Sequence, residues 1–361
     1  MKSSVCAVLT AALVLGLAAV PSASDQPETQ PAVGEWQLPM QPNDRLIELL
    51  GSGDGEVVSF TIMRYGRNQR MPQARPWMLN TSTGKLTNLL EAVGQDPEAE
   101  QSPASQAGPS PDGKHVLVMR LIRQEPVKLG GFLFTADSTD VHKLTEGMPL
   151  TSAWSGTKLL LSAVGDDNRV GRIQAYDPQT GEMAELPVCG LVVTADPGGR
   201  YLLAACNPDA PDEPLDRSEL GDCWICIVDM EGTVVAKLVS SDELSDRPVI
   251  SPNGKYIAFE RQRWENPVQP PEALGTRIAT SDGETVKDYP DVAPVAVGDD
   301  GTLTAAVVGE NRTFAAIHLI SPTGQNDRLV RRAVAAIVAG ERLFYVSPDE
   351  PTMLKSLPMD E

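Results

Sequence analysis

Four cysteines in the middle of the chain are the residues whose types and spacing could most directly do chemistry. Cys223 and Cys226 form a Cys-x-x-Cys pair, and Cys189 and Cys206 lie shortly before it. Such a pair serves thiol–disulfide exchange when it opens a helix, whose N-terminus lowers the thiol pKa. Here it opens an apolar run typical of a β-strand, which places its two side chains on opposite faces. We therefore expect structural cysteines rather than a redox centre. A structural zinc site is a further alternative, and it would need all four of these cysteines as ligands.

A second candidate is the acidic loop 207–222, which could bind a partner or a cation. Carboxylate oxygens are the ligands that calcium prefers, but the spacing matches no EF-hand, and prolines stiffen the loop. We expect a solvated interaction loop without a cofactor, and a structural calcium ion is the alternative. The candidate interaction residues are Asp209, Asp212, Glu213, Asp216, Glu219 and Asp222.

The sequence offers few histidines that could act in catalysis or bind a metal ion. The three histidines are His115, His142 and His318, and each lies in or beside an apolar run typical of a strand. The sequence contains neither a G-x-S-x-G elbow nor an H-E-x-x-H motif, which mark common hydrolase sites. We therefore assign no catalytic residue and no metal ligand.

The first 24 residues have the layout of a secretory signal peptide. A basic start at Lys2 is followed by an apolar stretch over 5–20 and by small residues at 21–24. We expect a signal peptide over 1–24, a flexible leader rich in Pro, Gln and acids over 25–34, and one folded domain over 35–361. The mature protein would be extracytoplasmic, either periplasmic or secreted, and not integral to a membrane; an uncleaved anchor is the alternative.

Export makes disulfides the expected state of the cysteines, because oxidising compartments favour them. Cleavage of the signal peptide removes Cys6, and the four remaining cysteines allow three pairings. We favour Cys206–Cys223, because these residues flank the acidic loop and a bond between them would close its neck. The alternative is Cys189–Cys206, since counting back from a four-residue turn at 196–199 places these two residues opposite each other.

The net charge limits the classes of partner. The chain of 361 residues carries a formal charge of -19 at pH 7, which repels phosphate backbones. We expect no nucleic-acid partner, and a monomer kept soluble by its charge.

The elements that must position these residues repeat along the chain. Tight turns rich in Gly, Asp, Asn and Pro each precede an apolar run, at 51–55, 110–113, 154–156, 196–199, 251–254, 298–301 and 339–341. A second series of hairpin turns lies between them, at 83–84, 180–181, 231–232, 282–283 and 323–324. Successive units are roughly 40 to 60 residues apart, the spacing of propeller blades. Two hairpins in series make a four-stranded blade, which predicts an all-β propeller.

The turn sequence resembles that of a known repeat. Ser-Pro-Asp-Gly-Lys at 110–114 and Ser-Pro-Asn-Gly-Lys at 251–255, each followed by a β-rich run, resemble TolB-type, WD-like β-propeller repeats. They also resemble the non-catalytic propellers of prolyl-oligopeptidase-like proteases. The segment 196–205 matches in part. The resemblance implies a fold for most of 45–361 and no catalytic residues.

We expect seven blades, with six as the alternative. The last unit supplies three strands, at 335–338, 343–346 and 353–357, and the segment 36–40 would supply the fourth. A ring closed in this way leaves no open sheet edge. The function we expect is that of an exported, non-catalytic binding or scaffold protein for a protein or glycan partner. The alternative is a propeller enzyme, similar to a lactonase or lyase, with its site in the central channel.

Overall fold

The computed structural model describes the chain from Gly34 to Met359, apart from residues 66–72, 95–105, 124–127, 137–140, 146–148, 166–167, 245–247, 264–270 and 309–313. The predicted signal peptide and all but the last residue of the predicted leader lie outside the described residues. Within the described ranges, no helix has the length and apolar character needed to span a membrane.

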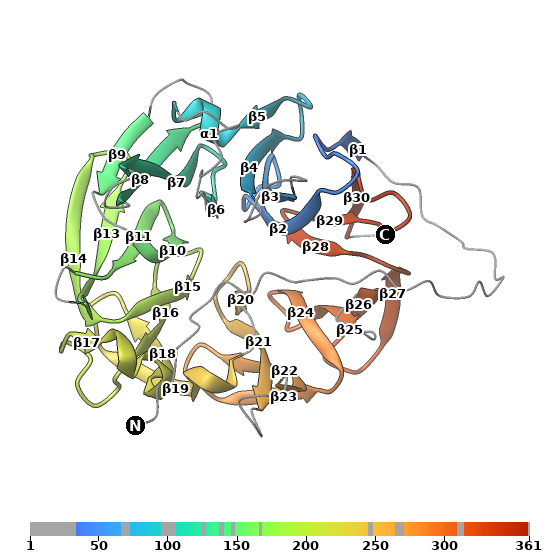
Figure 1. The fold of residues 1–361 in the computed structure, drawn as a ribbon. Helices are drawn as coiled ribbons and strands as arrows, with labels where there is room; N and C mark the ends of the chain where they lie inside the picture. The colour runs from blue at the N-terminus through green and yellow to red at the C-terminus, as the bar shows by residue number, and fades with distance from the viewer. Residues whose placement is uncertain are drawn as a thin grey trace.

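Seven four-stranded antiparallel sheets stand around a common centre, as Figure 1 shows, so the predicted seven-bladed propeller is confirmed. The strands closest to the centre are β2 (Arg45–Gly51), β6 (Gln106–Pro109), β10 (Pro149–Ser155), β15 (Leu191–Ala195), β20 (Val249–Ile250), β24 (Val292–Val297) and β28 (Ala335–Ala339). The second strands are β3 (Val57–Arg64), β7 (His115–Arg123), β11 (Lys158–Ala163), β16 (Tyr201–Cys206), β21 (Tyr256–Arg263), β25 (Leu303–Val308) and β29 (Arg342–Val346).

The outer half of each blade is a second hairpin. The third strands are β4 (Gln73–Asn80), β8 (Lys128–Thr135), β13 (Arg172–Asp177), β18 (Trp224–Asp229), β22 (Glu272–Thr280), β26 (Phe314–Ile320) and β30 (Met353–Pro358). The outermost strands are β5 (Leu86–Asn88), β9 (Val141–Thr145), β14 (Glu182–Cys189), β19 (Val234–Ser240), β23 (Thr285–Tyr289), β27 (Asn326–Val330) and β1 (Gly34–Gln37). Short helical turns are α1 (Leu89–Ala92), η1 (Arg217–Asp222) and η2 (Ser241–Glu243).

The N-terminal strand closes the ring, as predicted. β1 pairs antiparallel with β30, so the seventh blade combines both ends of the described chain. The strand ends earlier than the predicted segment 36–40, because Pro39 has no N–H to continue the ladder. Leu38 still donates its N–H to the Thr352 carbonyl at 2.8 Å and buries its side chain, with 1% exposed.

Both faces of each blade pack against neighbouring blades, which explains why the second strands are continuous apolar runs. All six residues of β16 are buried. One core cluster joins Phe60 of the first blade to Leu38, Phe344 and Leu354 of the seventh. Because a sheet with two packed faces has no solvent side, these strands lose the polar alternation of a half-exposed sheet.

The repeated turn is a local hydrogen-bonding device that joins the first and second strands. In the second blade, Ser110 Oγ donates to Asp112 Oδ1 at 2.6 Å and accepts the His115 N–H at 3.0 Å. Asp112 Oδ1 also accepts the Lys114 N–H at 3.2 Å. Gly113 has φ +68°, which a glycine adopts without steric cost. These contacts account for the Ser-Pro-Asp-Gly-Lys spacing without any chemistry toward a ligand.

The turns also connect one blade to the next. In the fourth blade, Asp196 takes the place of the serine, and its fully buried carboxylate accepts Arg200 Nε at 2.7 Å and the Arg200 N–H at 3.0 Å. The same guanidinium donates to the Asn253 carbonyl of the fifth blade. Asn253 N in turn donates to Asp299 Oδ1 of the sixth blade at 2.7 Å.

The Asp196→Asn variant should lose about 1–3 kcal/mol of unfolding free energy near neutral pH, because a buried hydrogen-bonded charge pair is broken. Burial alone would raise the pKa of Asp196, but the hydrogen bonds from Arg200 outweigh it and hold this pKa below its usual value. The ionised carboxylate therefore stabilises the fold above about pH 4, and this contribution disappears as the pH falls through the folded-state pKa.

Urea unfolding of wild type and Asp196→Asn across the acid range tests this. The difference in unfolding free energy between the two proteins should be constant above about pH 5 and shrink toward pH 3. A difference that stays constant down to that pH would contradict the assignment.

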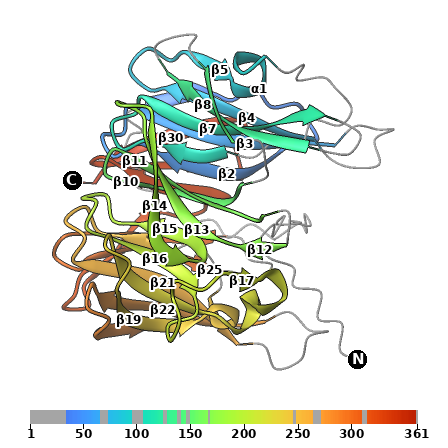
Figure 2. The same ribbon diagram turned by 90° about the vertical axis from the view of Figure 1, so that its left-hand side faces the viewer.

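The two faces of the ring differ in their connections. Strand order and antiparallel pairing place the connections between first and second strands, and those between third and fourth, on one face, here called the short-turn face. The other face, here called the long-connection face, carries the remaining connections, including α1, η1 and η2. Figure 2 shows α1 and the region of β12 (Arg169–Val170) and β17 (Leu215–Asp216) extending from this face.

Candidate functional site

The acidic insertion, residues 207–222, is an ordered part of the long-connection face. It joins β16 to β18 in the fourth blade and returns through the short strand β17, which pairs with β12 of the third blade. Leu215 and Leu220 bury their side chains in a core cluster together with Val170. The acidic loop, expected to be solvated, is therefore also anchored to two blades, by a two-residue ladder and by apolar packing.

A capping box shapes the C-terminal part of the insertion. Asp216 Oδ1 accepts the Ser218 N–H at 2.8 Å, and Glu219 Oε2 accepts the Asp216 N–H at 3.0 Å. The hydrogen bonds from Ser218 lower the pKa of Asp216. This arrangement satisfies N–H groups that a short helix leaves unpaired at its start. Two of the six predicted interaction residues therefore also have a structural role in η1.

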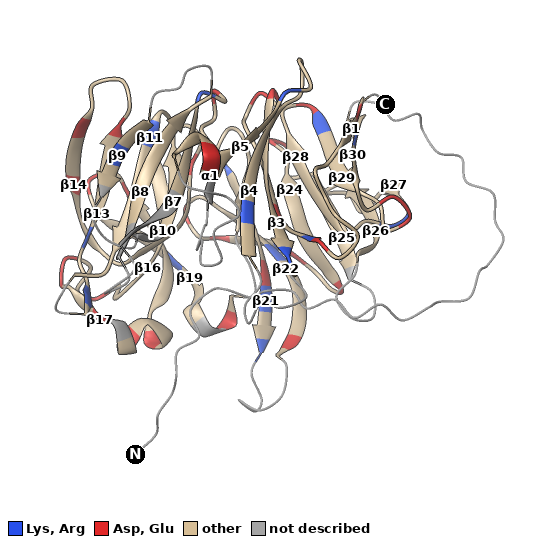
Figure 3. Cartoon of the chain, turned by 45° about the horizontal axis from the view of Figure 1, so that its top comes forward, with Lys and Arg blue, Asp and Glu red and all other residues tan. Residues whose placement is uncertain are grey.

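The other four acids of the insertion, Asp209, Asp212, Glu213 and Asp222, are exposed. Figure 3 shows acidic residues on the helical turn beside β17. The structure thus places the predicted acids on one connection of one face, turned toward solvent.

An exposed tryptophan lies next to these acids, and sequence reasoning missed it. Trp224 opens β18 directly after the insertion and leaves 40% of its surface exposed. Lys237 Nζ lies 6.0 Å from the centroid of the Trp224 ring and 3.3 Å from Asp209 Oδ1. The place of Trp224 in the sequence could have indicated its exposure, because it follows the insertion and precedes the core residues of its strand.

A calcium site finds no support in this geometry. Among the described residues, no group of three or more His, Cys, Asp or Glu side chains lies close enough to hold a metal ion. Asp209 is instead paired with Lys237, and Asp216 and Glu219 form the capping box.

The four cysteines in the described part of the chain are buried thiols in the third and fourth blades. Cys223 and Cys226 belong to different core clusters, so the prediction that they point to opposite faces of the sheet is confirmed. Cys206 shares its cluster with Cys226 and not with Cys223. Cys189 ends β14 in the third blade, and its Sγ lies 3.2 Å from the Asp212 carbonyl oxygen.

The expected register between Cys189 and Cys206 is wrong. Ala195 pairs with Leu202 and not with Arg200, and the ladder between β15 and β16 shifts between Val192 and Thr194. Counting back from the turn therefore does not lead to Cys189, which pairs with Arg172 in the preceding blade. The disulfide pairings themselves remain predictions.

The histidines lie away from the strands closest to the centre of the ring. His115 is on a second strand, where its Nδ1 lies 3.3 Å from Thr135 Oγ1 and burial lowers its pKa. His142 is on an outermost strand and His318 on a third strand. Among the described innermost strands, Glu48 is the single acid, and β24 and β28 carry small or branched apolar residues.

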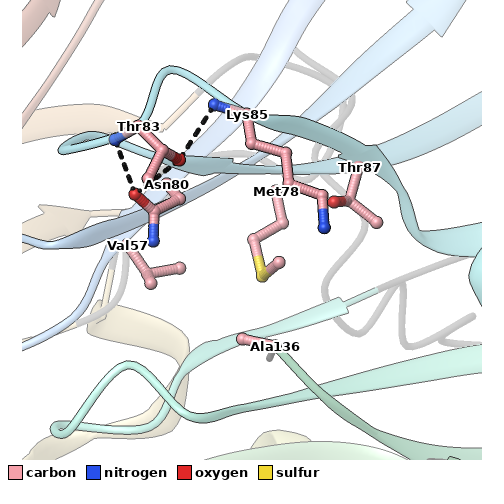
Figure 4. A pocket seen from close by; sticks show the side chains of 7 residues that line it. All are labelled: Val57, Met78, Asn80, Thr83, Lys85, Thr87 and Ala136. Atoms are coloured by element: carbon pink, nitrogen blue, oxygen red, sulfur yellow. Dashed lines mark hydrogen bonds between the residues drawn. The ribbon is translucent and has the colours of Figure 1, made fainter. Parts of the chain in front are cut away.

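A small pocket of about 160 Å³ lies between the first and second blades on the short-turn face. Figure 4 shows its lining residues, Val57, Met78, Asn80, Thr83, Lys85, Thr87 and Ala136. Asn80 Oδ1 already accepts the Thr83 N–H and hydroxyl, both at 2.9 Å. The polar groups here hold a hairpin turn together, so the long-connection face is the better candidate.

Comparisons with known proteins identify the fold. No family model and no curated protein matches the chain. A chain in the crystal structure of the mitotic checkpoint complex aligns with 14% identity and a TM-score of 0.55, covering 95% of this chain and 100% of that chain. The β-propeller domain of the Trilobed protease from Pyrococcus furiosus aligns with 13% identity and a TM-score of 0.53, covering 88% and 96%.

TolB from Acinetobacter baumannii also aligns, with 13% identity and a TM-score of 0.44, covering 86% of this chain and 66% of that one. Identities this low show the fold alone. On the strength of the first two likenesses, the chain is a β-propeller similar in fold to a protease propeller domain and to a chain of the mitotic checkpoint complex.

Proposed function

We propose that this chain is an exported, non-catalytic binding protein that holds a protein partner on its long-connection face. The acidic insertion supplies the recognition surface, and the partner presents basic side chains to it. The propeller acts as the rigid scaffold that holds the insertion in place.

The observation that carries this proposal is the ordered, anchored state of the acidic insertion. The β12–β17 ladder and the buried side chains of Leu215 and Leu220 hold its backbone before any partner arrives. Preorganisation of this kind lowers the entropic cost of association. The exposed acids would then steer a basic partner and set its orientation.

Trp224 extends this surface with an aromatic side chain. Tryptophan is enriched among the residues that dominate binding energies at protein interfaces. Its ring already lies near a cation, because Lys237 Nζ is 6.0 Å from the ring centroid. A Lys or Arg side chain of a partner could take that place and pair with Asp209 at the same time.

A protein partner fits this surface better than the other classes considered. Most glycans carry no cationic group, so the net negative charge of the insertion does not attract them over a distance. A propeller enzyme would need acids and a histidine converging near the centre of the ring, whereas the three histidines lie on outer or second strands.

Matched charge variants test the proposal. One variant neutralises four exposed acids of the insertion, as Asp209→Asn, Asp212→Asn, Glu213→Gln and Asp222→Asn. The control neutralises four exposed acids of the short-turn face, as Glu182→Gln, Glu231→Gln, Glu284→Gln and Glu341→Gln. Both variants change the net charge equally, and both leave the capping box intact.

The partner is first captured by cross-linking to the wild type in the native extracytoplasmic fraction, and its affinity for each purified protein is then measured. We expect the insertion variant to bind at least about tenfold more weakly and the control to bind like wild type. Equal affinities for all three proteins would refute the proposal. Captured glycan instead of protein would refute the choice of partner.

A further inference from the structure

Cys206 and Cys226 are neighbours on one face of the fourth blade. They lie on the adjacent strands β16 and β18, where Cys206 pairs with Trp224 and Ala204 pairs with Cys226. Residues opposite each other in an antiparallel ladder share a face, so Cys206 and Cys226 are diagonal neighbours on the same face. Both side chains are completely buried and belong to one core cluster.

The other two cysteines point elsewhere. Cys223 lies in the core cluster on the opposite face of the sheet, with its Sγ 3.6 Å from the Glu219 carbonyl oxygen. The Cys189 Sγ lies beside the Asp212 carbonyl oxygen, on a strand of the preceding blade. A bond from Cys206 to Cys223 would have to cross the sheet.

We propose that Cys206 and Cys226 form a disulfide when the chain folds in the presence of a low-molecular-weight disulfide oxidant, and that this bond fixes the neck of the acidic insertion. One thiolate attacks a sulfur of the oxidant and releases one thiol, which leaves a mixed disulfide. The second cysteine thiolate attacks that mixed disulfide and releases the second thiol. Two cysteine thiols are thereby oxidised by two electrons, and one oxidant disulfide is reduced to two thiols.

A disulfide between Cys206 and Cys226 would enclose the acidic insertion in a covalent loop. Cys206 is the last residue of β16, and Cys226 lies near the start of β18, so the covalent loop encloses the whole insertion. The interaction between the two thiols, together with burial, raises the pKa of Cys206, and the same interaction lowers the pKa of Cys226, so Cys226 is the thiol of the pair that ionises more readily.

Peptide mapping of the wild-type chain tests the pairing. The reduced, denatured chain is refolded with oxidised and reduced glutathione, alkylated in denaturant and digested with trypsin and chymotrypsin. Cleavage after Trp224 separates Cys223 from Cys226, so each pairing gives a different cross-linked peptide. We expect Cys206 joined to Cys226, with a mass two hydrogens below that of the two thiol peptides, and alkylated Cys189 and Cys223.

A cross-link from Cys206 to Cys223 or to Cys189, or alkylation of all of Cys189, Cys206, Cys223 and Cys226, would overturn the proposal. Cys226→Ser should abolish the cross-link, while Cys223→Ser, the matched control on the other face of the same blade, should retain it. Dithiothreitol should lower the melting temperature of the oxidised wild type by about 5 °C and leave that of Cys226→Ser unchanged. The peptide map of the wild-type chain identifies the cysteine pairing even if a variant fails to fold.

Discussion

A chain that starts at Pro39 should lose most of its stability, because it lacks the strand that closes the ring. It loses the β1–β30 ladder, the side chain of Leu38, which is 1% exposed, and the Trp36 ring, whose centroid lies 5.9 Å from that of Phe344. Removing one large apolar side chain from a core costs about 3–5 kcal/mol. The loss of the buried Leu38, the smaller loss from the half-buried Trp36 and an open edge on β30 together approach the whole stability of a domain, about 5–15 kcal/mol.

The matched control starts at Gly34, the first residue of β1. Thermal unfolding followed by circular dichroism should give this control the midpoint of the full chain. The chain from Pro39 should melt at least about 10 °C lower or show no cooperative transition. Equal midpoints for the two truncated chains would show that β1 is not needed for closure.

The Phe60→Ala variant should lose about 3–5 kcal/mol of unfolding free energy, the cost of an aromatic side chain removed from a packed core. Phe60 is completely buried in the cluster that joins the first blade to the seventh, so the remaining cavity lies at the closure of the ring. Urea unfolding gives the value. Val286→Ala, at a strand position that is 52% exposed, is the control and should change the free energy by under about 0.5 kcal/mol. A loss under about 1 kcal/mol for Phe60→Ala would contradict the described packing.

The blades could be predicted from the sequence because each turn is held by its own residues. Ser110, Asp112 and Gly113 carry the contacts and the backbone conformation of their turn within five positions of the chain. A turn that is held by its own residues forms wherever the same residues recur in the sequence. The closing strand was also predictable, since the last unit contained only three strands and β1 was the remaining apolar segment.

The site could be predicted only in part, because its geometry depends on contacts between blades. The acids of the insertion are evident in the sequence, but the pairing of Arg169 with Asp216 joins short segments of two different blades. The cysteine register was misjudged because the turn closes with Ala195 opposite Leu202, two positions beyond the expected Arg200, and the ladder then shifts by one position between Val192 and Thr194. A shift of one position changes which side chains face each other, and no local residue pattern marked it.

The segments that a bound partner protects from hydrogen–deuterium exchange locate the binding surface on the propeller. Hydrogen–deuterium exchange of the chain, alone and in complex with its cross-link-identified partner, reports this segment by segment. The proposed function predicts that new protection centres on residues 207–224 and on the adjoining β12, with the short-turn face unchanged. Protection confined to the short turns or to the innermost strands would contradict it, and would place the binding site elsewhere on the ring.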